Sequence, residues 1–215
     1  GPIYTPVDLN LISPVGLIPT ESKVVIGAQM NVLYGKSQSS YGVGLGIVNS
    51  VEDTMGGIYF GLFNYGKTFR GLVSSGLANN AESCYGICLS FVNEMTEEAS
   101  GILVGAYNKV AKANGNLQFG AANLMDEASG VVQIGFGNFA LYEATSTLQV
   151  GGINWGLSKF GGTQIGFFNL GFNEVNGLQV GLINYASTLN GFQIGLLNFA
   201  GSGGLPFMPI VNAGF

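Results

Sequence analysis

The stretch that decides the fold is GLQVGLINYASTLNGFQIGLLNFA, which runs from Gly177 to Ala200. It contains the phrase Gly-apolar-Gln-apolar-Gly-apolar-apolar-Asn twice, ending first at Asn184 and again at Asn198. A short fixed period is typical of a repeat architecture, so we expect one repeat domain over residues 1–215 without linkers. An Asn recurs at steps of 14 to 16 residues through most of the chain, at Asn49, Asn64, Asn79, Asn93, Asn108, Asn123, Asn138, Asn154, Asn169, Asn184, Asn198 and Asn212.

Within each repeat, apolar residues alternate with small or polar ones. Leu178, Val180 and Leu182 stand six, four and two places before Asn184, with Gln or Gly between them. A period of two predicts a β-strand with one buried face, and we expect the apolar positions to be the buried ones. The residue two places after each Asn is mostly small or apolar, as at Ala186, and we expect it to point inward as well.

Charged residues keep the same register. From Glu52 to Glu174, every Lys, Arg, Asp and Glu falls one to six places after an Asn. Each repeat is therefore expected to be an uncharged strand of about ten residues followed by a charged turn of about five. The signs of successive turns are mostly opposite, which favours turns that lie beside one another.

The repeat fits two all-β architectures. In a single-domain β-solenoid, each repeat of 14–16 residues is one coil, and about twelve coils stack in parallel with an inward Asn ladder. In the alternative, each repeat is one strand of an antiparallel β-meander closed into a barrel. Stacking favours the solenoid, because identical Asn residues then lie above one another and can bond the next amide and the next backbone. The expected ladder comprises Asn49, Asn64, Asn79, Asn93, Asn108, Asn123, Asn138, Asn154, Asn169, Asn184 and Asn198.

The ends of the chain depart from the repeat. We expect residues 1–41 to form an N-terminal cap and the first strand, residues 42–200 to hold the repeats, and residues 201–215 to form a C-terminal cap. Caps are needed because an uncovered terminal coil is an exposed sheet edge, and prolines in the last segment end strand addition.

Composition excludes several classes of function. Only 9% of residues are charged and the net charge is -5, so the clustered Lys and Arg that bind nucleic acid are missing. Histidine is absent and no phosphate loop is present, so we expect no enzyme, no catalytic residue and no cofactor. We also predict no metal site, since solvated turn residues are a simpler interpretation of the acidic cluster than a Ca²⁺ site. That cluster comprises Glu94, Glu97, Glu98, Asp126 and Glu127.

The only cysteines are Cys84 and Cys88. A Cys-x3-Cys pair without His is a poor zinc site. Residues four apart on an extended strand lie about 13 Å from each other, which is too far for a disulfide. We therefore expect two free thiols, with a short local disulfide as the alternative.

Two side-chain rows can contact other molecules. The Gln residues, at Gln118, Gln133, Gln149, Gln164, Gln179 and Gln193, are expected to form an amide ladder on the outer face, with a sugar-binding strip as the alternative. The aromatic residues just after the Asn are expected to stack as an outward stripe, either packed under the turns or exposed to a partner or a membrane. This interaction stripe comprises Tyr65, Phe139, Trp155, Tyr185 and Phe199.

The repeat GLQVGLIN, the close LPFMPIVNAGF and the opening YTPVDLNLISPVGLIP resemble a bacterial surface-repeat family first named from spirochaete surface proteins. The resemblance covers almost the whole chain, with opening, repeat and close in the family's order. It departs in the first half, where the Gln position holds Tyr59, Ser74, Cys88 and Leu103. The family implies export to the envelope of a double-membraned bacterium, and it carries no catalytic residues onto this chain.

These observations lead to one main functional hypothesis and two alternatives. We expect a non-catalytic cell-envelope or surface protein that acts as a structural, adhesive or assembly module, with self-association or a membrane surface as its contact. An outer-membrane β-barrel pore and a glycan-binding module are the alternatives, and a protein partner is not identified. Gly1 and Pro2 look like the remnant of a protease site, so we expect an export signal to have been removed.

Overall fold

A computed structural model describes residues 1–215, and the chain is all-β without a helix. It divides into two compact units, Gly1–Ala106 and Tyr107–Phe215. Each unit is a parallel β-solenoid, and the two units together contain about ten turns. The solenoid prediction is therefore confirmed, with fewer turns than the twelve or so we expected. Asn212, counted among the repeats, lies on a strand that folds back. The single-domain assignment stays a prediction.

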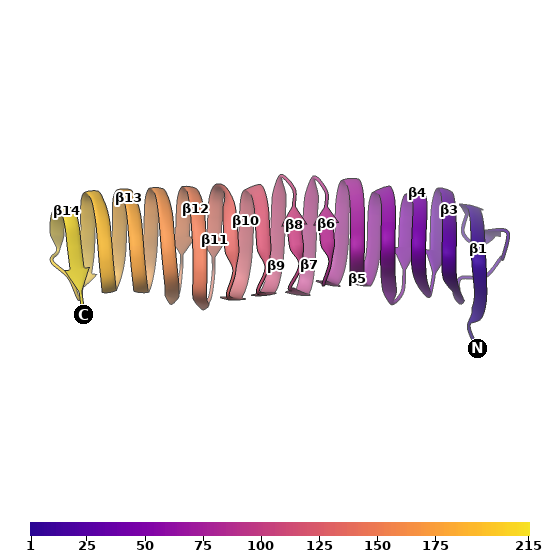
Figure 1. The fold of residues 1–215 in the computed structure, drawn as a ribbon, viewed down its shortest axis with the longest axis horizontal. Coiled ribbons are helices and arrows are strands. Elements are labelled where there is room, and N and C mark those ends of the chain that lie inside the picture. The colour runs from indigo at the N-terminus through magenta and orange to yellow at the C-terminus, as the bar shows by residue number, and fades with distance from the viewer. The chain divides into compact units, whose positions relative to one another are not determined.

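The first unit winds from the N-terminus through eight strands, coloured indigo to magenta in Figure 1. β1 pairs with β3 in parallel, β3 with β4, β4 with β5, β5 with β6 and β7, and β6 with β8, while the short β2 runs antiparallel to β1. The strands are β1 (Ile3–Ile12), β2 (Val15–Gly16), β3 (Lys23–Ser37), β4 (Ser39–Val51), β5 (Thr54–Cys84), β6 (Ile87–Leu89), β7 (Val92–Ala99) and β8 (Ile102–Val104).

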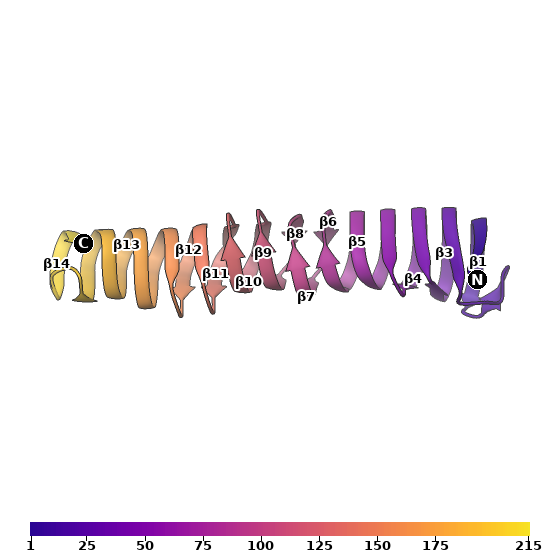
Figure 2. The same cartoon turned by 90° about the horizontal axis from the view of Figure 1, so that it is seen from below.

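The second unit stacks its coils in register and ends in a strand that turns back, shown in yellow in Figures 1 and 2. Gln pairs with Gln, Gly with Gly and Asn with Asn across β10, β11, β12 and β13. β14 then pairs antiparallel with β13 and closes this end of the unit. The strands are β9 (Tyr107–Asn114), β10 (Leu117–Ser129), β11 (Val132–Ala140), β12 (Ala144–Gly156), β13 (Phe160–Ser202) and β14 (Phe207–Gly214).

Parallel pairing between successive repeats decides between the two architectures. A meander needs antiparallel neighbours, whereas Asn123 pairs with Asn138, and Asn138 with Asn154, on parallel strands. Because the strands are parallel and in register, every repeat places the same residue at the same point of the coil. The alternative of an antiparallel β-meander closed into a barrel is therefore wrong, because neighbouring repeats pair in parallel.

Glycine is required at the two Gly positions of each phrase for different reasons. Gly177 and Gly191 have φ of +145°, a conformation that residues with a side chain rarely adopt, so the first glycine permits the bend at the start of each of these two phrases. Gly181 follows Val180, and a Cβ there would collide with the carbonyl oxygen of Gly166 and lie 2.6 Å from the Asn169 amide nitrogen. The second glycine therefore makes room for the amide of the preceding coil.

In the second unit, an apolar cluster of the interior lies in the segment that follows the Asn of each coil. Val175, Ala186, Leu189 and Ala200 are buried and form one cluster in the second unit. The inward position two places after the Asn is confirmed by Ala186 and Ala200. Where that position is Gly, a larger inward residue follows, as Phe160 follows Gly156, so the volume of the interior is conserved.

The burial expected for the alternating strand is wrong. Leu182 and Leu196, assigned to the core from the sequence, are exposed, whereas the Gln residues between the apolar positions are buried. The reason is that a coil of 14–16 residues encloses a narrow interior in which each amide finds an identical amide above and below it. Burying an amide costs little free energy when its hydrogen bonds are made inside the protein, and the bulky apolar side chains then lie outside the coil.

The caps differ in how they join the coils. Within residues 1–41, β1 and β3 already pair in parallel, so the N-terminal segment forms coils of its own and is covered by β2. Within residues 201–215, β14 supplies the cap by antiparallel pairing. Asn212 lies on β14 and donates to the Oε1 atom of Gln193 at 3.3 Å, so it belongs to the end of the Gln row and not to the Asn ladder.

Candidate functional site: amide ladders inside and an apolar face outside

The Asn ladder predicted from the repeat is confirmed in both units. Within each unit the Asn side chains, from Asn10 to Asn79 and from Asn108 to Asn184, donate from Nδ2 to Oδ1 of the next Asn of the ladder, at distances between 2.7 and 3.1 Å. The second proton of most ladder amides goes to a backbone carbonyl of the next coil, as from Asn138 to Val150 at 3.0 Å. These side chains are buried and their hydrogen bonds are satisfied within the protein.

The Gln ladder lies inside the coils and not on the outer face. Gln133 donates to Gln118, Gln149 to Gln133, and the series continues to Gln193 at distances of 2.8 to 2.9 Å. All six Gln side chains are fully buried, so the expected ladder is present but its expected face is wrong. A sugar-binding strip of Gln is excluded by the same burial. The Gln amides donate toward lower-numbered coils and the Asn amides toward higher-numbered ones.

Four coils of the first unit fill the Gln position with an aromatic or apolar side chain, whereas Gln29 and then Gly44 hold it in the two coils before them. Tyr59, Val73, Cys88 and Leu103 are all fully buried there. Val73, not Ser74, occupies the position, because Val73 pairs with Cys88 across the coils. Burial raises the pKa of Tyr59 to about 12, although a hydrogen bond to Ser40 at 2.7 Å opposes the shift.

A buried ion pair lies at the start of the first unit, and sequence reasoning missed it. Lys23 and Asp8 are fully buried with Nζ and Oδ2 2.9 Å apart, and Lys23 also donates to Oδ1 of Asn10 at 2.8 Å. Asn10 and Asn31 extend the ladder below Asn49, so the Lys23 ammonium meets the oxygen end of the row of amides. The irregular spacing of these residues hid them, but polar residues alternating with apolar ones in VDLN were the available signal.

The outer face of the second unit is apolar and uncharged. Its outward rows lie six, four and two places before each Asn, from Leu117 to Leu196, and no Lys, Arg, Asp or Glu lies in these positions. The row two places before the Asn is the most exposed, with exposed fractions of 70% for Phe136, 60% for Phe167 and 65% for Leu196. Monomeric proteins rarely leave so much contiguous apolar surface in water, so this face is the candidate functional site.

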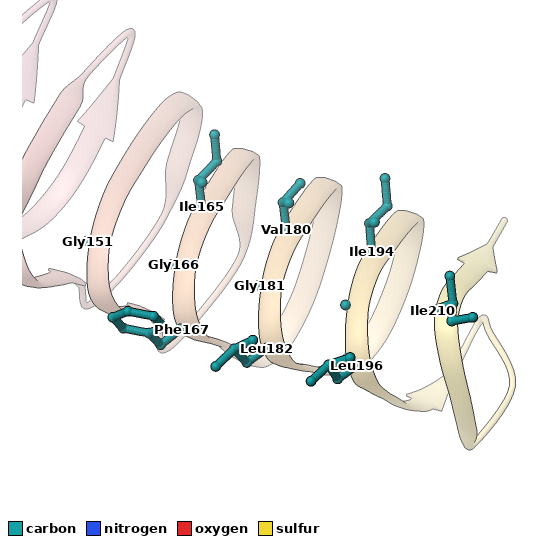
Figure 3. Close-up of a pocket in the computed structure, with 11 residues that line it drawn as sticks. Gly151, Ile165, Gly166, Phe167, Val180, Gly181, Leu182, Ile194, Leu196 and Ile210 are labelled. Atoms are coloured by element: carbon teal, nitrogen blue, oxygen red, sulfur yellow. The ribbon is translucent and has the colours of Figure 1, made fainter.

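A groove runs along this face between two of the rows (Figure 3). Its walls are the row of Ile165, Val180, Ile194 and Ile210 on one side and the row of Phe167, Leu182 and Leu196 on the other. The floor consists of Gly151, Gly166, Gly181 and Gly195. The groove has a volume of about 560 Å³ and carries no charged side chain. The glycines that admit the buried Asn amides thus also create an apolar channel on the outside.

The first unit has a similar face. Ile58, Phe60 and Leu62 are the outward residues of one coil, and each is exposed. A smaller groove of about 310 Å³ lies between further pairs of outward residues, including Ala28 and Met30 and also Val43 and Leu45. Apolar exposure therefore follows from the repeat and occurs in each unit independently.

The aromatic stripe is outward and only partly exposed. Trp155 lies 4.6 Å from Phe172 and 6.4 Å from Phe139 between ring centroids, and Phe172 lies 5.7 Å from Tyr185. Phe172 was missed, because it lies three places after its Asn, where aromatic residues do not recur. Phe199 packs on Phe207 of β14 at 5.2 Å, and in the first unit Tyr65 stacks on Phe63 at 6.2 Å. The rings contact one another along the coils, and such contacts stabilise the stack.

The prediction of two free thiols is wrong. Cys84 and Cys88 form a disulfide, and their Cα atoms are 7.0 Å apart. β5 ends at Cys84 and β6 begins at Ile87, so the chain turns between the cysteines and the extended-strand distance does not apply. Both cysteines are fully buried inside the coil, where Cys88 takes the position that Gln holds in the second unit.

Charged side chains of the repeats lie in the segment after the Asn of each coil, and several of them pair between adjacent coils. Lys112 lies 3.8 Å from Glu127, and Lys159 lies 3.8 Å from Glu174, each pair one repeat apart. The Lys36 ammonium donates hydrogen bonds to Glu21 and Glu52. These bonds raise the pKa of Lys36, and the bond to Glu21 has the larger effect. The opposite signs of successive turns are explained by these pairs. In the acidic cluster, Glu94, Glu97 and Glu98 lie on β7 and Asp126 and Glu127 on β10, so the prediction of a charged turn is wrong there, and no group of three metal-ligating side chains is assembled.

No family model, curated protein or solved structure matches this chain in the comparisons made. No helix is long and apolar enough to cross a membrane.

Proposed function

We propose that the protein is a non-catalytic structural module of the bacterial cell envelope that assembles through its apolar face. The observation that supports this proposal is the division of chemistry between inside and outside. The Asn and Gln side chains are buried and bond one another, while Ile, Leu, Val and Phe side chains cover the outer face. A surface of this kind gains free energy by contact with another apolar surface and offers no grouping for substrate chemistry.

The resemblance of the repeat and of both ends of the chain to the surface-repeat family supports location in the envelope of a double-membraned bacterium. The pore alternative depends on antiparallel neighbouring strands, which the repeats do not form. The glycan alternative depends on free aromatic faces, whereas the aromatic rings of the second unit are packed on one another.

Cell fractionation tests the proposal. The chain is produced behind an export signal in a double-membraned bacterium, together with a variant that carries Ile165→Lys and Val180→Lys. We expect the unaltered protein in the envelope fraction and the variant in the soluble fraction, because two charges on the face oppose its burial. A matched control, Ser187→Lys with Thr188→Lys, places the same charges on β13 after Asn184, outside the apolar face, and should stay with the envelope. Recovery of the unaltered protein in the soluble fraction would overturn the proposal.

A further inference from the structure

We infer that the uncharged face of the second unit is a self-complementary interface on which a second copy of this chain packs face to face. The inference deepens the proposed function and rests on it, since it names the partner of the same face. The contact residues are the three outward rows of β10 to β13 and the neighbouring part of β14. Phe167, Leu182, Leu196 and Ile210 line the groove in the part of the face that lies on β13 and β14.

The area of the face agrees with what a stable dimer needs. Six residues span about 20 Å along each strand, and seven adjacent strand segments about 4.8 Å apart span about 34 Å. The face therefore measures about 680 Å², against about 800 Å² that each partner contributes to a specific interface of standard size. The largest apolar patch on a typical monomer is about 300–600 Å². One unit alone thus presents nearly a full interface.

The surface shape of the face is complementary to the same face on a second copy. The outward rows form ridges about 6.7 Å apart, because neighbouring outward residues on a strand are two residues apart. Between the ridges four and two places before the Asn lies the groove with its glycine floor. A second copy has ridges and a groove of the same spacing, and its coils repeat along the axis at the same interval. A ridge of one copy can therefore enter the groove of the other, as the side chains of paired sheets interdigitate.

The charges favour a second copy over a lipid surface. Proteins that lie on bilayers usually border their apolar face with Lys and Arg, which attract anionic headgroups. This chain has 7 Lys and Arg against 12 Asp and Glu, and the charged residues of the second unit follow the Asn of each coil, away from the face, with opposite signs paired between coils. No basic border surrounds the face. Two copies that meet through it keep all their charges in water.

Sedimentation of the full chain without detergent tests the inference. We expect a dimer at about 100 µM that dissociates on dilution toward about 1 µM or below. Leu182→Glu with Leu196→Glu, and Leu182→Lys with Leu196→Lys, should each raise the dissociation constant at least about 100-fold, because like charges then face one another. A mixture of the two variants should associate again. Tyr142→Glu, on an exposed turn, is the matched control and should stay dimeric.

The mixture of the Glu variant with the Lys variant is the decisive experiment. Opposite charges can restore the dimer only if the two faces contact each other. A wild type that is monomeric at about 100 µM overturns the inference, and so does a mixture that stays monomeric. A monomer that floats with phosphatidylcholine vesicles, and loses flotation in the Lys variant, assigns the face to lipid and also overturns it. In that case the fractionation result can still hold, so the proposed function and the self-pairing fail separately.

A measurement on the wild-type protein tests the inference without relying on variants that must fold. Carbene labelling at about 1 µM and about 100 µM compares the dissociated and associated states. Phe167, Leu182 and Leu196 should become protected at the higher concentration, whereas Tyr142 should label equally in both. Equal labelling of the face at both concentrations, with a dimer present by sedimentation, would place the interface elsewhere and overturn the inference.

Discussion

Replacing one member of the ladder, Asn138→Ala, tests the internal architecture most directly. The Asn138 side chain accepts a hydrogen bond from Nδ2 of Asn123 at 2.9 Å and donates to Oδ1 of Asn154 at 2.9 Å. It also donates to the carbonyl oxygen of Val150 at 3.0 Å. The residue is fully buried, so water cannot replace these partners.

The magnitude follows from the groups that the change leaves without partners. Asn123 keeps its bond to the Ile134 carbonyl at 3.1 Å, but its second amide proton loses its acceptor. Oδ1 of Asn154 loses its donor. Each buried polar group left unsatisfied costs about 1–3 kcal/mol, so we expect a loss of about 3–5 kcal/mol in the free energy of unfolding.

Chemical denaturation followed by circular dichroism measures the loss. The control is Asn176→Ala, which removes the same side chain from the surface and should cost less than about 0.5 kcal/mol. Gln164→Thr provides a second comparison. From the sequence alone this change was expected to cost less than Asn138→Ala, but Gln164 is fully buried between Gln149 and Gln179, so we now expect a comparable loss. Equal small effects of Asn138→Ala and Asn176→Ala would refute the buried ladder.

Three further predictions concern other parts of the interior. Gly181→Ala should destabilise the fold by more than about 1 kcal/mol in the same assay, because the added Cβ collides with the Gly166 carbonyl; an unchanged midpoint contradicts this. Since the pKa of Tyr59 is raised to about 12 from an ordinary value of 10.0, the folded state holds its proton longer, so stability should fall as pH rises from 10 to 12. Tyr59→Phe should flatten that fall, and an identical pH profile would contradict the assignment. Cys84 and Cys88 should resist iodoacetamide in denaturant until they are reduced, and reduction should cost about 2 kcal/mol; alkylation without reductant would show free thiols.

Much of the fold could be predicted from the sequence because coils that stack in register repeat their residues in the chain. The recurrence of Asn from Asn49 to Asn198 predicted the solenoid and its ladder, and both are present. The small residue two places after the Asn, as at Ala186, was correctly placed inside, since the strand continues one buried face past the Asn. The pairing of turn charges followed for the same reason.

The face that is buried was decided only by the tertiary structure. An alternation of period two separates two sides of a strand, but it does not state which side is inside. A single Gln179 considered on its own is costly to bury and Leu182 is favourable to bury, so the sequence indicated the opposite of what is found. The partners that satisfy Gln179 lie about one coil away along the chain, at Gln164 and Gln193, and they become neighbours only when the coils stack.

The same reason explains the other errors. The distance between Cys84 and Cys88 depends on the corner between β5 and β6, and the burial of Lys23 depends on Asp8 from another strand. Local patterns therefore determined the period, the strands and the ladder of this protein. Which groups face one another across the narrow interior depends on contacts between coils, and these contacts alone placed the amides inside and the apolar side chains outside.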